Sequence, residues 1–499
     1  MVEEKATNSY NHVLKYTGVF GGVQGLNIVT ALVRNKLVAV LLGPVGMGLS
    51  SLLNTSVNFL SQVTNLGLSF SAVKHISELY DSGDEKAFYH FIKVIRVWAL
   101  LTALLGLLVG VVASPLLDSL TFSWGDHTLH FLLVSPAVAL MAITGGEMAI
   151  LKGTRQLRTL AVLQIYTVLA SLILSVPFYY FFGHKAIVPV IVLIALVTTL
   201  LTIHYSYRLY PLQLSDIKGV LNEGREMIKL GVAFIAAAII GSGAEMIVRS
   251  YLSYTAGLDF VGLYNAGYMV TITYAGLVFS SMETDYFPRL SAIPQHEVSL
   301  RNITINRQIE VSLLLLSPML TALIVALPLI IPLMFSKMFY TVIPMAQMAI
   351  FSMYIKSLSL PLGYTNLAVG NSKGFLLLEV LYYTAFVLFT IVGYEHWGLV
   401  GTGGALVLAY VIELLSVYTY VHCKYGISLS RPVMAYFTFH FAVAVLTYAT
   451  TFIDNTLLHW GLSLCGLLSA CLFSLSVLHK KTSLWNALKR KVMKSESKV

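Results

Sequence analysis

Long apolar runs with very few charged residues follow one another through the whole 499-residue chain. Hydrophobic residues make up 57% of it and charged residues only 11%, whereas a soluble domain carries roughly a quarter charged residues. Inside a bilayer every backbone polar group needs an internal partner, so such runs form helices or closed barrels. The runs are continuous and lack the alternation of barrel strands. We therefore expect an all-α polytopic membrane protein.

At about 20 residues per span, the runs predict about fourteen transmembrane helices. The expected spans are 13–42, 45–73, 94–114, 129–151, 159–181, 187–207, 230–253, 261–284, 310–334, 342–362, 374–393, 398–421, 434–452 and 459–479. The connections between them are short, which leaves no room for a soluble catalytic domain.

Most of the 32 basic residues fall on one side of this helix pattern. That side includes Lys74, Arg96, Lys152 and Arg289 together with the basic tail, whereas the opposite loops carry mainly acids such as Asp118. Because loops rich in Lys and Arg stay in the cytoplasm, both termini are expected to be cytoplasmic. The first apolar run has no cleavage site and is expected to remain as a helix.

The chain also shows a weak internal repeat with an offset of about 215 residues, typical of transporters with parallel repeats that enclose a substrate path. The repeat predicts a lobe of six helices in residues 1–220, an equivalent lobe in 221–433, and two further helices with a basic cytoplasmic tail in 434–499. The matches are Leu14-Lys15 and Gly18-Val19 with Ile228-Lys229 and Gly231-Val232, Val33-Arg34 with Val248-Arg249, Val45-Gly46-Met47 with Val261-Gly262-Leu263, and Lys74 with Arg289.

Four basic residues lie inside apolar segments: Arg34, Lys36, Arg249 and Lys356. A charge at the bilayer centre is costly and usually serves an ion or substrate route. Arginine binds phosphate oxygens bidentately, so the four predict a site for a pyrophosphate or another anionic headgroup. Two alternatives stay open. Arg34 and Lys36 could snorkel to the membrane interface, and Glu245 could pair with Arg249 along one helix.

Five acids also lie in or beside apolar segments: Glu147, Glu245, Glu283, Glu379 and Glu413. Buried carboxylates are proton or sodium sites in many transporters. On this basis Glu147, Glu245 and Glu379 are candidates for ion coupling. Structural pairing is the competing interpretation, for example of Glu379 with Lys373.

Motifs of enzymes and ATP-driven pumps are missing from the sequence. It has no P-loop, no HExxH zinc motif and no GxSxG nucleophile elbow, and its three cysteines have no metal-ligand spacing. We therefore expect neither enzymatic activity nor a cofactor or metal.

Several segments resemble one family of transporters. They are Arg34-Asn35-Lys36-Leu37-Val38-Ala39-Val40-Leu41-Leu42-Gly43-Pro44-Val45-Gly46-Met47-Gly48, Ala72-Val73-Lys74-His75-Ile76, Leu151-Lys152-Gly153, Pro361-Leu362-Gly363 with Ala368, Gly370 and Glu379, and Gly398-Leu399-Val400-Gly401 with Gly403 and Ala405. Together they are similar to the Wzx-type flippases, which include the O-antigen and enterobacterial common antigen (lipid III) translocases.

This resemblance implies the multidrug/oligosaccharidyl-lipid/polysaccharide (MOP) exporter superfamily, with two six-helix lobes, a cationic central cavity and alternating access. It also implies an undecaprenyl-pyrophosphate-linked oligosaccharide as the substrate, the bacterial inner membrane as the location, and Arg34, Lys36 and Arg249 as cavity cations. Many relatives have an Asp-Arg doublet where this chain has Glu245 and Arg249. Polysaccharide polymerase and chain-length regulator proteins are the expected partners, besides membrane lipids.

Two other functions compete with a flippase. A cation-coupled multidrug exporter of the MATE type needs a cavity dominated by carboxylates, whereas the cations predominate here. A membrane glycosyltransferase or polymerase needs a large outer loop with catalytic acids, and the longest outer loop, around 115–128, is short. The basic tail suits anionic lipid heads, and no nucleic-acid partner is expected.

Overall fold

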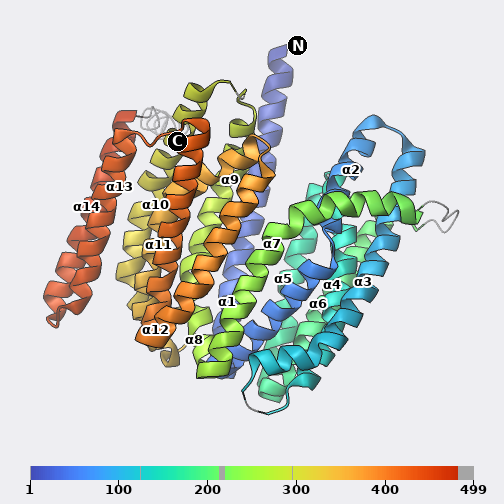
Figure 1. The fold of residues 1–499 in the computed structure, drawn as a ribbon, viewed down its shortest axis with the longest axis horizontal. Coiled ribbons are helices and arrows are strands. Elements are labelled where there is room, and N and C mark those ends of the chain that lie inside the picture. Colours follow the sequence, from blue (N-terminus) through green and yellow to red (C-terminus); the bar gives the residue numbers. More distant parts are fainter. Residues whose placement is uncertain (1, 124, 213–219, 295, 482–499) are drawn as a thin grey trace, which may run out of the picture. The chain divides into compact units, whose positions relative to one another are not determined.

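The computed structural model describes the backbone of residues 2–123, 125–212, 220–294 and 296–481, and every regular element in these ranges is a helix (Figure 1). The longer helices are α1 (Val2–Thr64), α2 (Leu68–Ser82), α3 (Glu85–Thr121), α4 (Thr128–Gly153), α5 (Leu157–Phe182), α6 (Ile187–Leu209), α7 (Val220–Ala256), α8 (Leu258–Tyr268), α9 (Ala275–Ser291), α10 (Val298–Met334), α11 (Ile343–Ala368), α12 (Ser372–Tyr425), α13 (Arg431–Ala449) and α14 (Thr456–Lys481). Short helical turns are η1 (Gly183–Ala186), η2 (Met269–Tyr274), η3 (Lys337–Val342) and η4 (Thr450–Phe452).

Among the described residues, ten helical segments are long and apolar enough to cross a membrane. Three of these, Val29–Thr64, Leu157–Leu209 and Ser372–Tyr425, contain a break that divides them into two helices. The predicted all-α membrane fold is confirmed. The predicted span 45–73 is too long, since its helix ends at Thr64 and a turn leads into α2.

Glycine makes the breaks inside α1 and α12 possible. Gly43 has φ 64° and Gly398 has φ 57°, in the region that side chains with a Cβ rarely adopt. After Gly398 the chain doubles back, so that the backbones of Gly393 and Gly401 touch. A Cβ on either glycine would overlap the carbonyl oxygen of the other. The two halves of α12 are therefore neighbouring antiparallel helices.

By its internal packing the chain divides into two units. The N-terminal unit comprises Met1–Asn265 with Leu333–Met338, and the C-terminal unit comprises Ala266–Pro332 with Phe339–Val499. In the N-terminal unit α7 packs against α1, α2 and α3, and in the C-terminal unit α11 packs along α12. The lobes 1–220 and 221–433, which rest on the sequence repeat, stay a prediction.

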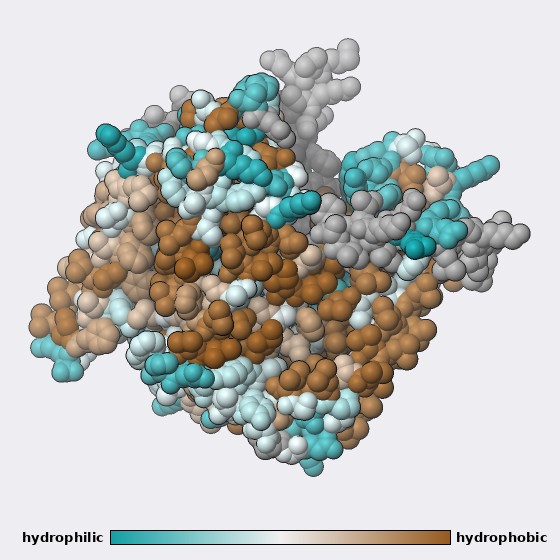
Figure 2. Space-filling model, in the orientation of Figure 1, coloured by the Kyte–Doolittle hydropathy of each residue, from teal (hydrophilic) through white to brown (hydrophobic). Residues whose placement is uncertain are grey.

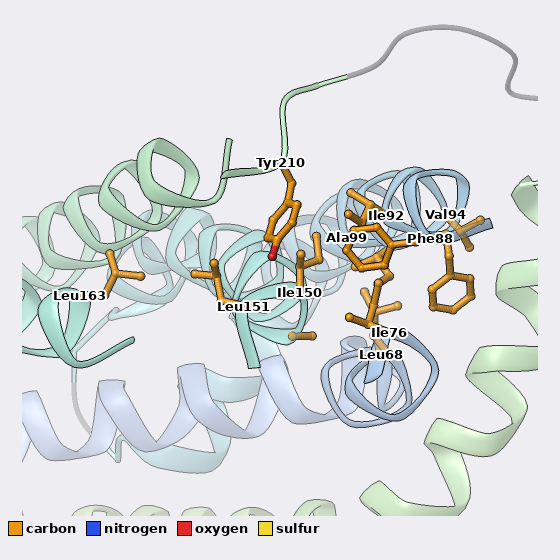
Figure 3. Packing of buried hydrophobic residues seen from close by; sticks show 14 residues of the cluster. Leu68, Ile76, Phe88, Ile92, Val94, Ala99, Ile150, Leu151, Leu163 and Tyr210 are labelled. Carbon is orange, nitrogen blue, oxygen red and sulfur yellow. The ribbon is translucent and has the colours of Figure 1, made fainter. Parts of the chain in front are cut away.

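Each unit has its own apolar core. In the N-terminal unit, residues of α2, α3, α4 and α5 surround Ile92, Ile150 and Leu151, and Tyr210 reaches into them from the segment after α6 (Figure 3). In the C-terminal unit the core joins α9 to α13 around Leu313 and Leu358. These cores fix the helices that carry the buried charges.

The outer surfaces of the helices are apolar over their middle parts and polar toward their ends (Figure 2). On α3, Leu100, Leu104, Leu108 and Val112 are 54–77% exposed and recur every fourth residue, which forms one continuous stripe. Such a stripe is stable only against lipid. The predicted basic tail beyond Lys481 and the side chain of Glu283 lie outside the described part of the chain.

Candidate functional site

The break in α1 folds the first half of the helix against the second. Pro44 has no backbone N–H to continue the helical ladder, and Gly43 supplies the reversal. The carbonyl oxygen of Leu42, next to the break, accepts a 2.9 Å hydrogen bond from Nε2 of His184, at the turn after α5. The sequence stretch that resembles the flippase signature is thus a helical hairpin with a capped tip.

Arg34 lies on the first half of this hairpin, about nine residues or roughly 13 Å before the tip. The hydroxyl of Tyr179 on α5 interacts with both Arg34 and Ser50, and Ser50 lies on the second half. Arg34 is half-buried, and its Nε is enclosed without a hydrogen-bond partner. No carboxylate pairs with it among the described side chains. Arg34 therefore keeps donor capacity for an anion.

Lys36 is half-buried on the same helix. Residues two positions apart on a helix point to opposite sides, so Lys36 and Arg34 do not face one anion together from this helix. This helix alone therefore does not bring the two predicted cations to one site.

Arg249 on α7 is only 5% exposed and is fully engaged by its neighbours. Its Nη1 donates to the Glu245 carboxylate at 3.0 Å, its Nε to the Ser51 hydroxyl of α1 at 3.1 Å, and its Nη2 to Asn265 of α8 at 3.5 Å. The intrahelical pair with Glu245, left open by the sequence, is present. In this conformation Arg249 connects three helices, and Glu245 neutralises it.

Two glycines allow α1 and α8 to touch next to this arginine. A Cβ on Gly48 would overlap the carbonyl oxygen of Leu258, and a Cβ on Gly262 would overlap that of Pro44. Gly262 belongs to one of the repeat matches. The backbones thus meet just after the α1 break, where Arg249 holds the second half of α1 against α7 and α8.

Glu147 on α4 forms a buried ion pair with Arg96 on α3. Arg96 donates from Nε at 2.9 Å and from Nη2 at 3.3 Å, and Ser206 of α6 donates to the same carboxylate at 2.5 Å. Arg96 also donates to the carbonyl oxygen of Tyr210 at 2.8 Å and lies over the Tyr207 ring. Arg96 and Glu147 are 7% and 3% exposed. With these partners, Glu147 resembles a structural anchor more than an ion-coupling site.

The sequence pattern counts Arg96 with the basic residues of the cytoplasmic loops, although the predicted span 94–114 contains it, and the structure places it inside α3. Asp84 caps α3, accepting a hydrogen bond from the amide of Ala87, so the helix begins well before the predicted start at residue 94. Arg96 is a buried helical residue, and it was not among the predicted site residues. A basic residue among the apolar residues Ile92, Ile95 and Val97 was the available signal.

Lys356 lies in the C-terminal unit, among groups quite unlike those around Arg34. Its Nζ is 5.5 Å from the ring centre of Phe279 and 5.7 Å from that of Tyr410. Glu379 and Glu413 both interact electrostatically with it. Lys356 thus belongs to a mixed charge cluster that also contains the predicted coupling residue Glu379.

Three solved structures show the fold in other proteins. A lipid II flippase MurJ in an inward closed conformation is 14% identical, with a TM-score of 0.71, over 94% of this chain and 99% of its own. An inward-facing MATE-family multidrug resistance transporter of the MOP superfamily is 12% identical, with a TM-score of 0.66, over 80% and 94%. A MOP superfamily transporter from Pyrococcus furiosus is 14% identical, with a TM-score of 0.56, over 86% and 94%. The chain therefore has the MOP-superfamily fold.

Family membership rests on sequence. A search of curated proteins gives no significant match. The family model described as "Polysaccharide biosynthesis protein" matches residues 13–294, more than half of the chain and the part that carries Arg34, Glu147 and Arg249. This protein therefore belongs to the polysaccharide biosynthesis protein family.

Proposed function

We propose that this protein is a flippase that moves a polyprenyl-pyrophosphate-linked oligosaccharide, such as an undecaprenyl-linked O-antigen or common-antigen unit, across the bacterial inner membrane. Transport runs from the cytoplasmic to the periplasmic leaflet by alternating access. Membership in a polysaccharide biosynthesis family supports a glycan precursor as the cargo. The likeness in fold to a protein named as a lipid II flippase supports a lipid-linked one.

The observation that carries this proposal is the state of Arg34. A guanidinium inside a membrane helix, without a carboxylate partner among the described residues and next to the Tyr179 hydroxyl, is an anion site. A bare pyrophosphate in hydrocarbon is prohibitively costly, and the planar arginine fork binds phosphate oxygens bidentately. The phosphates travel past Arg34, the prenyl tail stays in lipid, and the glycan passes through water.

Arg249 takes a second phosphate contact by exchanging partners. Its carboxylate partner Glu245 is 35% exposed in its side chain, so it can turn toward water while Arg249 stays fixed by Ser51 and Asn265. Lys36 and Lys356 remain proposed contacts of the same anionic headgroup.

A cation-coupled drug exporter is the second candidate, and the observation that favours it is the pair of half-buried acids Glu379 and Glu413 beside Lys356. The family match to polysaccharide biosynthesis favours the flippase. Depletion of the protein in its host separates the two. A flippase predicts loss of surface glycan with accumulation of its lipid-linked precursor, whereas unchanged glycan with greater drug sensitivity would favour the exporter.

We also propose that both termini are cytoplasmic, which is the orientation favoured by the basic residues of the loops. Reporter fusions at Gly183, in the turn after α5, and at Glu395, beside the break in α12, are expected to read as periplasmic. Fusions at Asp84 and at the C-terminus are expected to read as cytoplasmic. A cytoplasmic signal from Gly183 would contradict this orientation.

A further inference from the structure

An apolar groove of about 600 Å³ lies in the C-terminal unit, between the two halves of α12 and α11. It is hollow because three glycines, Gly393, Gly401 and Gly404, place no side chains in this seam. A Cβ added to Gly404 would meet no side chain and no other helix within 4 Å. The walls are larger apolar side chains: Met348, Phe389, Val392, Trp397, Val400 and Leu408. The groove is thus large enough to hold part of an organic molecule.

The groove opens to the outside of the helices and has a definite depth in the membrane. Its wall residues Trp397, Leu408 and Val392 are 69%, 52% and 47% exposed. Leu408 lies ten residues, or roughly 15 Å, along the helix from the break at Gly398, whereas the hydrocarbon core is about 30 Å thick. Trp397 stands beside this break, and tryptophan is enriched at the membrane interface. The groove therefore runs from the interface through a single leaflet.

Hydrocarbon is the occupant that this lining fits. Apart from the indole N–H of Trp397, the described lining residues carry no polar side-chain group. An ordered water needs two to four polar partners, so water is not held there, and an empty groove would forfeit dispersion contacts on all its walls. The walls continue into the apolar outer surface of the helices, which lipid covers (Figure 2). The chains of the surrounding lipids are therefore what fills the groove.

We propose that this groove binds one acyl chain of a phospholipid, with the headgroup at the interface beside Trp397. A phospholipid chain ends within its own leaflet, as the groove does, whereas a polyprenyl tail is much longer than one leaflet. The bound chain makes the contacts that the three glycines cannot make, so it packs the two halves of α12 against α11. The site contains no charged residue and does not depend on the proposed transport.

Native mass spectrometry of purified, delipidated protein tests the site, with dioleoyl phosphatidylethanolamine as the probe. The wild type is expected to bind one lipid saturably, and Gly404→Leu is expected to lose it because the leucine side chain occupies the groove. The matched control is Gly461→Leu on α14, where an added Cβ also meets nothing within 4 Å, and it keeps the lipid. Leu408→Trp narrows the groove from an exposed position and is expected to weaken binding about tenfold or more.

Melting temperatures separate a filled groove from a damaged protein. The lipid raises the melting temperature of the wild type and of Gly461→Leu but not that of Gly404→Leu. Without lipid, Gly404→Leu melts no lower than the wild type, since the leucine replaces the missing chain.

Three results overturn the proposal. One is equal lipid binding by the wild type, Gly404→Leu and Leu408→Trp, and another is binding that never saturates. The third is a different occupant: undecaprenyl phosphate that displaces the phospholipid one for one, or a dimer of the wild type that Gly404→Leu abolishes.

Discussion

Arg34→Ala is expected to abolish export of the glycan while the protein remains folded and inserted. The guanidinium supplies charge-assisted hydrogen bonds to the pyrophosphate, each worth about 1.5–3 kcal/mol, or roughly 10- to 150-fold in rate or affinity. Since no carboxylate pairs with Arg34 in the described structure, its removal leaves no buried charge behind. Surface glycan in a flippase-null strain, normalised to the protein level in the membrane, measures the effect.

Two variants complete this test. Arg34→Lys is expected to keep part of the activity, because an ammonium still attracts phosphate but lacks the fork geometry. Arg158→Ala removes an exposed arginine at the start of α5 and is expected to leave export unchanged. Arg249→Ala is a poorer probe, since it also breaks the contacts with Ser51 and Asn265. Full export by an Arg34→Ala, Arg249→Ala double mutant would contradict the proposed phosphate site. It would favour the alternative that Arg34 extends to the membrane interface.

Glu147→Ala is expected to destabilise the protein strongly. It leaves the Arg96 guanidinium buried without its counter-charge, and removing one partner of such a pair costs about 3–5 kcal/mol. A lower melting temperature in detergent and less protein in the membrane are the measurable results. Asp81→Ala breaks the exposed pair with Arg155 and is expected to cost at most about 1 kcal/mol.

Replacing the whole pair separates folding from function. An Arg96→Met, Glu147→Leu variant removes both charges and is expected to recover most of the lost stability. Recovery stays incomplete because the Tyr210 carbonyl oxygen loses its donor. If Glu147→Ala melts like the wild type, the pair is not a structural anchor. Glu147 then becomes a candidate for ion coupling again.

The fold was largely predictable, because apolar length and continuity determine membrane helices. The sequence even separated the two halves of α1 near Gly43, where a Gly-Pro pair interrupts the run. The predicted end of the second half was wrong, because the apolar pattern continues past Thr64 into α2. The turn there depends on left-handed backbone at Leu66 and Gly67, and hydropathy does not register it.

The sequence predicted individual charged residues of the site, but it predicted few of the contacts between them. The sequence identified Arg34, Arg249 and Lys356 as costly charges, and it named the Glu245 pair because four-residue spacing is local. It missed the pairing of Arg96 with Glu147, which are 51 residues apart and on different helices. It also grouped Lys356 with the phosphate-binding cations, although its neighbours are acids brought in by the doubling back of α12.

Purified protein reconstituted into liposomes tests the central claim most directly. The vesicles contain a polyprenyl-pyrophosphate-linked oligosaccharide in both leaflets, and a glycosidase added outside cleaves only the glycan that it can reach. Wild-type protein is predicted to expose the inner-leaflet pool to cleavage, while vesicles with Arg34→Ala protein or without protein keep it protected. An inner pool that stays protected with folded wild-type protein, under an imposed proton or sodium gradient, would contradict the account.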